Sequence, residues 1–229
     1  DYMCDSIYFL PSNKESVKQI YEKEKFDSIA ISFGGQTALN LGLELYKENF
    51  FKDNNIRVLG TSLESVILAE DRNRFADLMV EIGEPIARRF IITDIEQIDK
   101  GIEYVKFPIF IRNNFCLGGL GSVFINNKED LIIKVTEFLK HSDNVVLEQD
   151  ITGWKEVEYE IMRDYNGNCE TIVNMENFCP VGIHTGDSIV VSPSQTLNNE
   201  EYYGLRKSSI KIATALDIVG ECNCQLALN

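Results

Sequence analysis

The segment from Arg112 to Ser122 joins a cation to a glycine-rich loop, with the sequence RNNFCLGGLGS. Glycine lets the backbone adopt positive φ and lets a ligand approach the main chain closely. Consecutive backbone N–H groups in such a loop can surround an anion such as a phosphate. The segment is therefore either a lid over a nucleotide triphosphate or a glycine-rich hairpin turn. It does not fit the P-loop pattern, because no Gly-Lys-Ser/Thr follows.

A second segment, from Gly153 to Arg163, places Glu156, Glu158 and Glu160 at alternate positions. Alternate residues of a β-strand share a face, so these three carboxylates are expected on one side. Like charges on one strand face repel each other unless solvent or a ligand neutralises them. The face is therefore either solvated, or it accepts hydrogen bonds from ligand hydroxyls or binds a cation.

The loop from Gly182 to Ser188 contains His184, one of two histidines in the chain. The residues of this loop are small and polar, and it is expected to connect two strands. A lone histidine is more often structural than catalytic, but a position between glycines in a polar loop leaves both roles open.

Arg72 and Arg74 lie near the start of a helix that is expected to run from Ala69 to Gly83. The helix macrodipole disfavours cations at that end. Each arginine therefore needs a negative partner, which is either a neighbouring carboxylate such as Asp71 or a bound anion.

Alternating strands and helices are expected to position these segments. The stretch 27–40 reads as a strand, a glycine turn and a helix, which indicates an α/β unit with a parallel sheet. Ligands of such sheets gather at the carboxyl ends of strands, so the turn from Gly34 to Thr37 is either a ligand site or a tight turn. Periodicity and capping patterns predict helices over 13–24, 69–83, 94–104, 128–141 and 199–216. Two further helices are expected to begin at residues 36 and 61. They predict strands over 27–33, 56–59, 86–93, 107–111, 123–126, 145–148, 153–163, 171–175, 189–193 and 221–228.

Composition narrows the class of protein. The chain has 229 residues and a net charge of −14, which argues against a nucleic-acid-binding surface. No apolar run is long enough to cross a bilayer, and no secretory signal is visible. The six cysteines are scattered, which predicts reduced thiols and a cytoplasmic protein. The absence of an initial methionine and the apolar final residues predict an excerpt from a longer polypeptide.

Three segments together resemble the amino-terminal synthetase half of carbamoyl-phosphate synthetase: 33–40, 153–160, and 182–188 with 193–197. Residues 69–72 and 117–122 agree with it, and residues 218–223 look like the eukaryotic form. The resemblance covers essentially the whole chain. It implies an α/β protein with a partial Rossmann-like pre-ATP-grasp domain over 1–67, which lacks its first strand. An α+β ATP-grasp domain over 68–229, truncated at its carboxyl end, would follow.

The resemblance also implies an activity. This half of the synthetase uses ATP to phosphorylate bicarbonate to carboxyphosphate, and ammonia then converts carboxyphosphate to carbamate on the way to carbamoyl phosphate. Pyrimidine and arginine biosynthesis use that product. The implied partners are a glutamine amidotransferase subunit or domain and the carboxyl-terminal synthetase half, without nucleic acid or membrane. The fragment alone is expected to be inactive. The alternatives are an ATP-grasp carboxylase of the biotin carboxylase type and a non-catalytic nucleotide-binding remnant.

Site residues follow from the resemblance position by position. Arg72 and Arg112 would contact the nucleotide phosphates, and with His184 they are the candidate catalytic residues. The other implied ATP contacts are Gly118 and Gly119 in the lid, Ile151 at the adenine with Glu148 or Gln149 at the edge of that pocket, Glu156 at the ribose, and Gly182 and Ile183 beside His184. Gln225 would bind the catalytic metal. The implied cofactors are ATP with Mg²⁺ or Mn²⁺, and K⁺.

The chain departs from the family pattern at a few positions. Asn113 and Asn114 replace the usual small residues after Arg112, and Val123 stands where the lid usually has a glycine, which predicts a stiffer lid. Cys179 replaces an acidic residue near the monovalent-cation site that the family builds with Glu156, Asn177 and Ser188. These departures bear on lid closure and on K⁺ binding.

Overall fold

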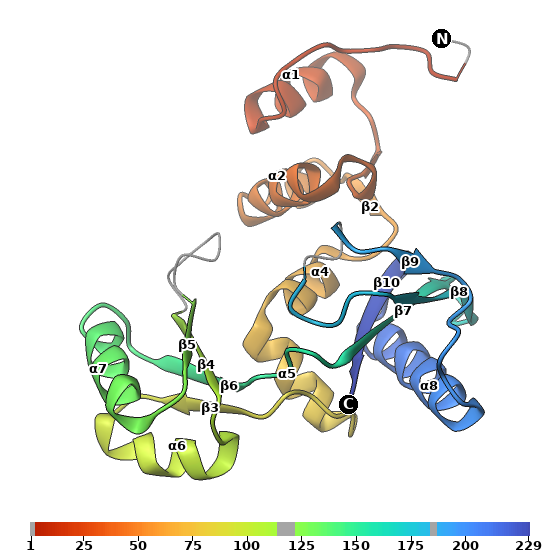
Figure 1. Cartoon of the computed structure of the whole chain (residues 1–229). Coiled ribbons are helices and arrows are strands. Elements are labelled where there is room, and N and C mark those ends of the chain that lie inside the picture. Colours follow the sequence, from red (N-terminus) through yellow and green to blue (C-terminus); the bar gives the residue numbers. More distant parts are fainter. Residues whose placement is uncertain (1–2, 114–121, 184–186) are drawn as a thin grey trace. The chain divides into compact units, whose positions relative to one another are not determined.

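The computed structural model in Figure 1 describes residues 3–113, 122–183 and 187–229, and at 112, 113 and 122 it describes the backbone alone. The chain divides into two compact units. The first unit comprises residues 1–84, 159–174 and 196–224, and the second comprises 85–158, 175–195 and 225–229. The alternation of helices and strands confirms the expected α/β class.

The first unit contains a small parallel sheet with helices packed beside it. Strand β1 pairs with β2 so that Ser28 lies opposite Arg57 and Ala30 opposite Leu59. A helix connects these strands, as parallel pairing requires. Its elements are α1 (Lys14–Glu24), β1 (Ser28–Ala30), η1 (Ser32–Gly34), α2 (Gly35–Lys47), α3 (Phe50–Asp53), β2 (Arg57–Leu59), α4 (Leu63–Glu70), α5 (Arg72–Glu81) and α8 (Asn199–Ala215). The core beside the sheet is formed by Ile31, Leu45, Phe50, Phe51, Ile56 and Leu63.

Two helix starts differ from the sequence expectation. The first helix, expected from residue 13, begins at Lys14, because Asn13 is its cap and accepts through its side chain from the N–H of Ser16. The helix expected over 69–83 starts later than predicted, because α4 ends at Glu70 and α5 begins at Arg72. Asp71 lies between them in an extended conformation and accepts from the N–H groups of Asn73 and Arg74. An aspartate that satisfies two N–H groups starts a new helix there.

The second unit is centred on an antiparallel sheet with the strand order β3-β6-β4-β5. The strands are β3 (Arg89–Ile92), β4 (Ile109–Asn113), β5 (Ser122–Ile125) and β6 (Val145–Gln149). The helical elements are η2 (Ile95–Gln97), α6 (Ile98–Val105) and α7 (Lys128–Leu139). One apolar cluster joins these helices to the sheet and includes Ile92, Val105, Ile109, Ile111, Leu131, Val135 and Leu147. The cluster packs beneath β4, the strand whose end carries Arg112.

A second sheet has the order β10-β7-β8-β9, and its three long strands each run from one unit into the other. They are β7 (Lys155–Arg163), β8 (Cys169–Asn177) and β10 (Gly220–Leu228), with the short edge strand β9 (Val190–Val191). The hairpin expected between β7 and β8 is present, with Gly167 at a φ of 86°. No helix within the described residues is long and apolar enough to cross a membrane.

Candidate functional site

Asn177, at the end of β8, connects two of the three alternating glutamates of β7. Its Nδ2 donates to Oε1 of Glu158 at 2.6 Å and to Oε1 of Glu156 at 3.0 Å. Both Asn177 and Glu158 are buried, at 4% and 6% exposure. The carboxylates on this part of the strand face are therefore not simply solvated, because Asn177 holds both of them by hydrogen bonds.

The same asparagine leaves one strong acceptor unused. Its Oδ1 is buried and has no hydrogen-bond partner among the residues that the structure describes. A buried carbonyl oxygen without a donor is uncommon and calls for an explanation such as an ion. Beside two carboxylates, such an oxygen has the donor chemistry of a cation ligand.

The opposite face of the same strands has its own polar contacts. Glu176 is 7% exposed, accepts from the N–H of Gln195 at 2.8 Å, and lies 3.9 Å from Nζ of Lys155. Neighbouring residues of a strand point to opposite faces. Glu176 therefore supports the loop after β9, while the adjacent Asn177 orients the carboxylates on the other face.

Gln149, at the end of β6, is held by the chain segment before β3. Its Oε1 accepts from the backbone N of Arg88 at 3.2 Å and from Nε of Arg88 at 3.1 Å, and its N–H donates to the Arg88 carbonyl at 2.8 Å. Glu148 pairs in register with Arg89 and Phe110. Arg88 was not predicted, and its only signal in the sequence is a cation just before an apolar strand.

Two loops of the second unit lie side by side. The N–H of Gly153 donates to the carbonyl of Val181 at 2.9 Å, and the N–H of Val181 donates to the carbonyl of Trp154 at 2.9 Å. A Cβ on Gly182 would lie 3.1 Å from Thr152, and the φ of Gly182 is 109°. The structure therefore brings the segment of Ile151 next to that of Gly182 and Ile183.

Arg112 lies in β4, where its backbone pairs with Val146 of β6 and Ser122 of β5. The strand and hairpin expected around the glycine loop are therefore present. Gly118, Gly119 and His184 lie outside the described residues, and the side chain of Arg112 is likewise not described.

Arg72 and Gln225 belong to different units. Arg72 is the first residue of α5 in the first unit, directly after the capping Asp71. Gln225 is an exposed residue of β10 in the second unit. By strand alternation, Gln225 shares its face of β10 with Glu221 and Asn223.

The first unit holds a second group of carboxylates, in which the third of the alternating glutamates, Glu160, meets two residues of β10 that were not predicted as site residues. Nδ2 of Asn223 on β10 donates to Oε1 of Glu160 at 2.9 Å. A hydrogen bond with Glu160, together with burial, raises the pKa of the Glu221 carboxyl above its ordinary value. The alternate polar residues of β10 can be read from the sequence. Their contact with Glu160 of β7 cannot, because it depends on the order of the strands in the sheet.

These contacts can orient carboxylates, a glutamine amide and backbone groups around a ligand, but they supply no activated nucleophile. Within the described residues, no group of three or more His, Cys, Asp or Glu side chains could hold a metal ion by itself. Cys222 is not a reactive thiol, because burial raises its pKa to about 12. Such an arrangement suits binding and positioning rather than covalent catalysis.

Two family models match the chain in succession. The model described as "Carbamoyl phosphate synthase preATP-grasp domain" matches residues 1–68. The model described as "Carbamoyl-phosphate synthase L chain, ATP binding domain" matches residues 71–229.

Two curated relatives align with 99% of the chain at 48% identity: multifunctional protein pyr1-3 of Dictyostelium discoideum and the mitochondrial arginine-specific carbamoyl phosphate synthase large chain of Neurospora crassa. The chain spans 10% and 19% of the length of these two relatives.

Solved structures show the same fold. The biotin carboxylase domain of Hydrogenobacter thermophilus 2-oxoglutarate carboxylase, in complex with MgADP, ADP and bicarbonate, matches with a TM-score of 0.71. The match covers 99% of this chain and 52% of that one, at 18% sequence identity. At that identity the likeness concerns the fold alone, and it confirms the ATP-grasp fold that the sequence predicted.

Proposed function

The chain belongs to the carbamoyl-phosphate synthase large-chain family, and we propose that it forms the part of such an enzyme that binds ATP and makes carboxyphosphate. The observation that carries this proposal is the match of the ATP-binding family model to residues 71–229. Relatives named as carbamoyl phosphate synthases or CAD are 44–48% identical to the chain. The biotin carboxylase alternative has support from the fold alone.

In this proposal the second unit provides most of the nucleotide contacts. Ile151, Gly182 and Ile183 line the adenine side with Gln149, whose amide is fixed by Arg88. Glu156 accepts hydrogen bonds from the ribose hydroxyls. The hydrogen bond from Asn177 holds Glu156 in one orientation, so less side-chain entropy is lost when the nucleotide binds.

The chemistry requires positioned cations rather than a nucleophilic side chain. A bicarbonate oxygen attacks the γ-phosphorus of ATP, the bond to the β,γ-bridging oxygen breaks, and ADP leaves. Arg72, Arg112 and the amides of Gly118 and Gly119 stabilise the charge on the phosphates, and His184 is a further candidate contact. Ammonia then attacks the carbon of carboxyphosphate, phosphate leaves, and loss of a proton gives carbamate.

Metal ions belong to the same proposal. Gln225 would be one ligand of Mg²⁺ or Mn²⁺, which when bound neutralises charge on the phosphates. Asn177 Oδ1, beside Glu156 and Glu158, fits a monovalent cation such as K⁺, because it is a buried acceptor without a donor among the described residues. Near it the backbone N–H of Cys179 donates to Oγ of Ser188 at 3.2 Å. Cys179 in place of an acidic residue removes a carboxylate from this position, which predicts weaker K⁺ binding.

The pathway and the partners that we propose are those suggested by the names of the relatives. Carbamoyl phosphate made from the carbamate would supply arginine or pyrimidine biosynthesis, with ammonia from a glutamine amidotransferase part and a second phosphorylation in the carboxyl-terminal half. The proposed domain boundary lies near residue 67. The cytoplasmic location expected from the thiols is part of the proposal, whereas the Neurospora relative is named as mitochondrial.

The decisive experiment grafts this chain into the Neurospora crassa large chain in place of its aligned segment. Bicarbonate-dependent ATP hydrolysis is then measured without a nitrogen donor. We expect hydrolysis that requires both bicarbonate and Mg²⁺. Arg72→Ala and Arg112→Ala should abolish it, whereas Arg74→Ala, on the same helix as Arg72, should retain it.

The isolated 229-residue chain is expected to show no such turnover. A folded graft that hydrolyses ATP without regard to bicarbonate would overturn the carboxyphosphate assignment. A folded graft that binds no ATP would instead indicate a non-catalytic remnant of the fold, in which Asn113, Asn114, Val123 and Cys179 mark lost function.

A further inference from the structure

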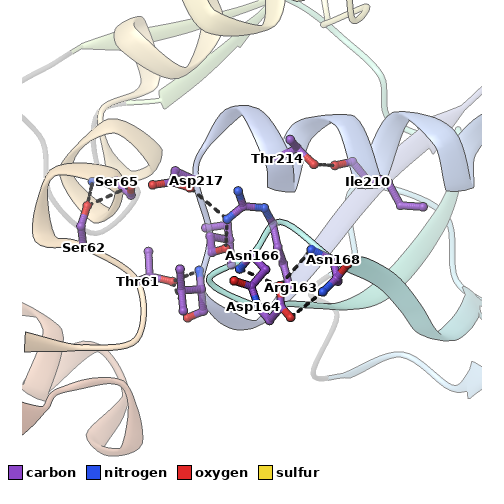
Figure 2. Close-up of polar contacts among 12 residues, drawn as sticks. Thr61, Ser62, Ser65, Arg163, Asp164, Asn166, Asn168, Ile210, Thr214 and Asp217 are labelled. Atoms are coloured by element: carbon purple, nitrogen blue, oxygen red, sulfur yellow. Dashed lines mark hydrogen bonds and ion pairs between the residues drawn. The ribbon is translucent and has the colours of Figure 1, made fainter.

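Thr61 makes a two-way hydrogen bond to a residue far along the chain. Its Oγ1 donates to the carbonyl oxygen of Val219 at 3.0 Å and accepts from the N–H of Val219 at 3.0 Å (Figure 2). Gly60, just before it, has a φ of 88°, and a Cβ there would lie 3.5 Å from the same carbonyl oxygen. One hydroxyl therefore satisfies both backbone groups of Val219.

Arg163, at the end of β7, holds the preceding residue. Its Nη1 donates to the carbonyl oxygen of Ile218 at 2.7 Å and lies 2.9 Å from Oδ1 of Asp217 (Figure 2). The Arg163 side chain is 11% exposed, whereas that of Asp217 is 73% exposed. Exposed ion pairs contribute little, so the hydrogen bond to the backbone carbonyl is the stronger constraint.

The turn from Asp217 to Gly220 depends on these two side chains. Asp217 and Gly220 both have positive φ, at 50° and 108°. The helix α8 satisfies the N–H groups of Asp217 and Ile218, through the carbonyls of Thr214 and Ala213. Thr61 and Arg163 satisfy the groups that remain around Ile218 and Val219. Buried backbone groups need such partners, so loss of either side chain should loosen the turn.

Two elements that carry proposed site residues begin at this junction. The chain from Thr61 enters α4, at whose end Asp71 caps α5 and places Arg72. The chain from Val219 enters β10, the strand that contains Gln225. A cation–π contact of 5.6 Å between Arg57 of β2 and Tyr165 of the β7–β8 hairpin adds a further link.

We propose that Thr61 and Arg163 are positioning residues, which fix the start of α4 and the start of β10 so that Arg72 and Gln225 reach their working positions. This inference rests on the function proposed above for Arg72 and Gln225. It concerns neither substrate contact nor chemistry by Thr61 or Arg163 themselves.

The test combines hydrogen exchange on the 229-residue chain with kinetics in the Neurospora graft. Thr61→Val removes its hydrogen bonds and keeps the side-chain shape, and Arg163→Met removes the guanidinium and keeps a shorter unbranched side chain. We expect amide exchange at residues 218–224 to accelerate about tenfold, while amides of β4 and β6 are unchanged. In the graft, the Mg²⁺ concentration for half-maximal hydrolysis should rise about tenfold. Thr61→Ser and Asp217→Asn should change both quantities less than about twofold.

Each result decides a different point. Faster exchange with an unchanged Mg²⁺ requirement would overturn the positioning role and leave a structural one. Unchanged exchange would show that Thr61 and Arg163 do not hold the turn from Asp217 to Gly220. If Thr61→Val or Arg163→Met does not fold, Arg163→Lys decides, because it keeps one donor and should give a smaller acceleration at the same amides. A wild-type graft without bicarbonate-dependent hydrolysis would refute the proposed function. The exchange results would then still show whether Thr61 and Arg163 hold the turn from Asp217 to Gly220.

Discussion

Asn177 and Glu158 are joined by a hydrogen bond of 2.6 Å between two buried side chains, and the second N–H of the same amide reaches Glu156. Hydrogen bonds to charged acceptors are stronger than neutral ones. A single amide therefore keeps two like charges on one strand face compatible with the fold.

Asn177→Asp should destabilise the chain strongly at neutral pH. The change removes both donors and adds a third carboxylate in a buried position, so the loss should be about 3 kcal/mol or more. Urea denaturation measures it. Asn168→Asp is the matched control: Asn168 donates to Asp164 at 2.8 Å in an exposed turn, and there the loss should stay below about 1 kcal/mol. Equal losses in the two variants would show that burial of the network is unimportant.

Glu221→Gln should stabilise the chain at neutral and alkaline pH. The hydrogen bond with Glu160, then burial, raises the pKa of Glu221 above its ordinary 4.5, so the folded state prefers the protonated form. Stability is therefore full below 4.5 and falls as pH rises through the raised pKa. The variant should have a higher melting temperature than wild type at about pH 8 and the same melting temperature at about pH 4. The gain in free energy of unfolding at pH 8 should be less than about 1 kcal/mol, because the pair is partly solvated.

Glu64→Gln is a control with the opposite sign. The hydroxyl of Tyr46 donates to Glu64 at 2.5 Å and lowers the pKa of that carboxyl. Its contribution to stability is present above the ordinary pKa and disappears as pH falls, so the variant should melt below wild type at about pH 8. If both glutamine variants shifted the melting temperature in the same direction at that pH, the assignment for Glu221 would be wrong.

Short-range patterns predicted most elements, because a helix or strand shows its buried face as a local period. The hairpin at Gly167 and the strand β7 are examples, and β6 ends at Gln149, one residue beyond its predicted end. Where a polar side chain had two possible uses, local sequence did not decide between them. Thr61 fits a capping pattern, yet Ser62 caps α4 and Thr61 bonds to Val219, 158 residues away. The pairing of Gln149 with Arg88 likewise depends on the sheet order.

Gly42→Ala and Gly204→Ala should change stability in opposite directions, although both glycines lie inside helices of the first unit. A Cβ on Gly42 in α2 would lie 2.9 Å from Cδ1 and 3.3 Å from Cγ2 of the buried Ile31. Overpacking of this kind costs about 1–3 kcal/mol, and most of that range exceeds the gain of about 1 kcal/mol from better helix propensity.

Gly204 in α8 is exposed, and a Cβ there would meet no atom within 4 Å. The gain in helix propensity is then unopposed, so Gly204→Ala should stabilise the chain by about 1 kcal/mol. Thermal melts of the two variants measure the difference, and Gly42→Ala combined with Ile31→Val should recover part of its loss because the side chain in contact becomes smaller. Stabilisation by both single substitutions would mean that α2 does not pack against Ile31 as closely as these distances require.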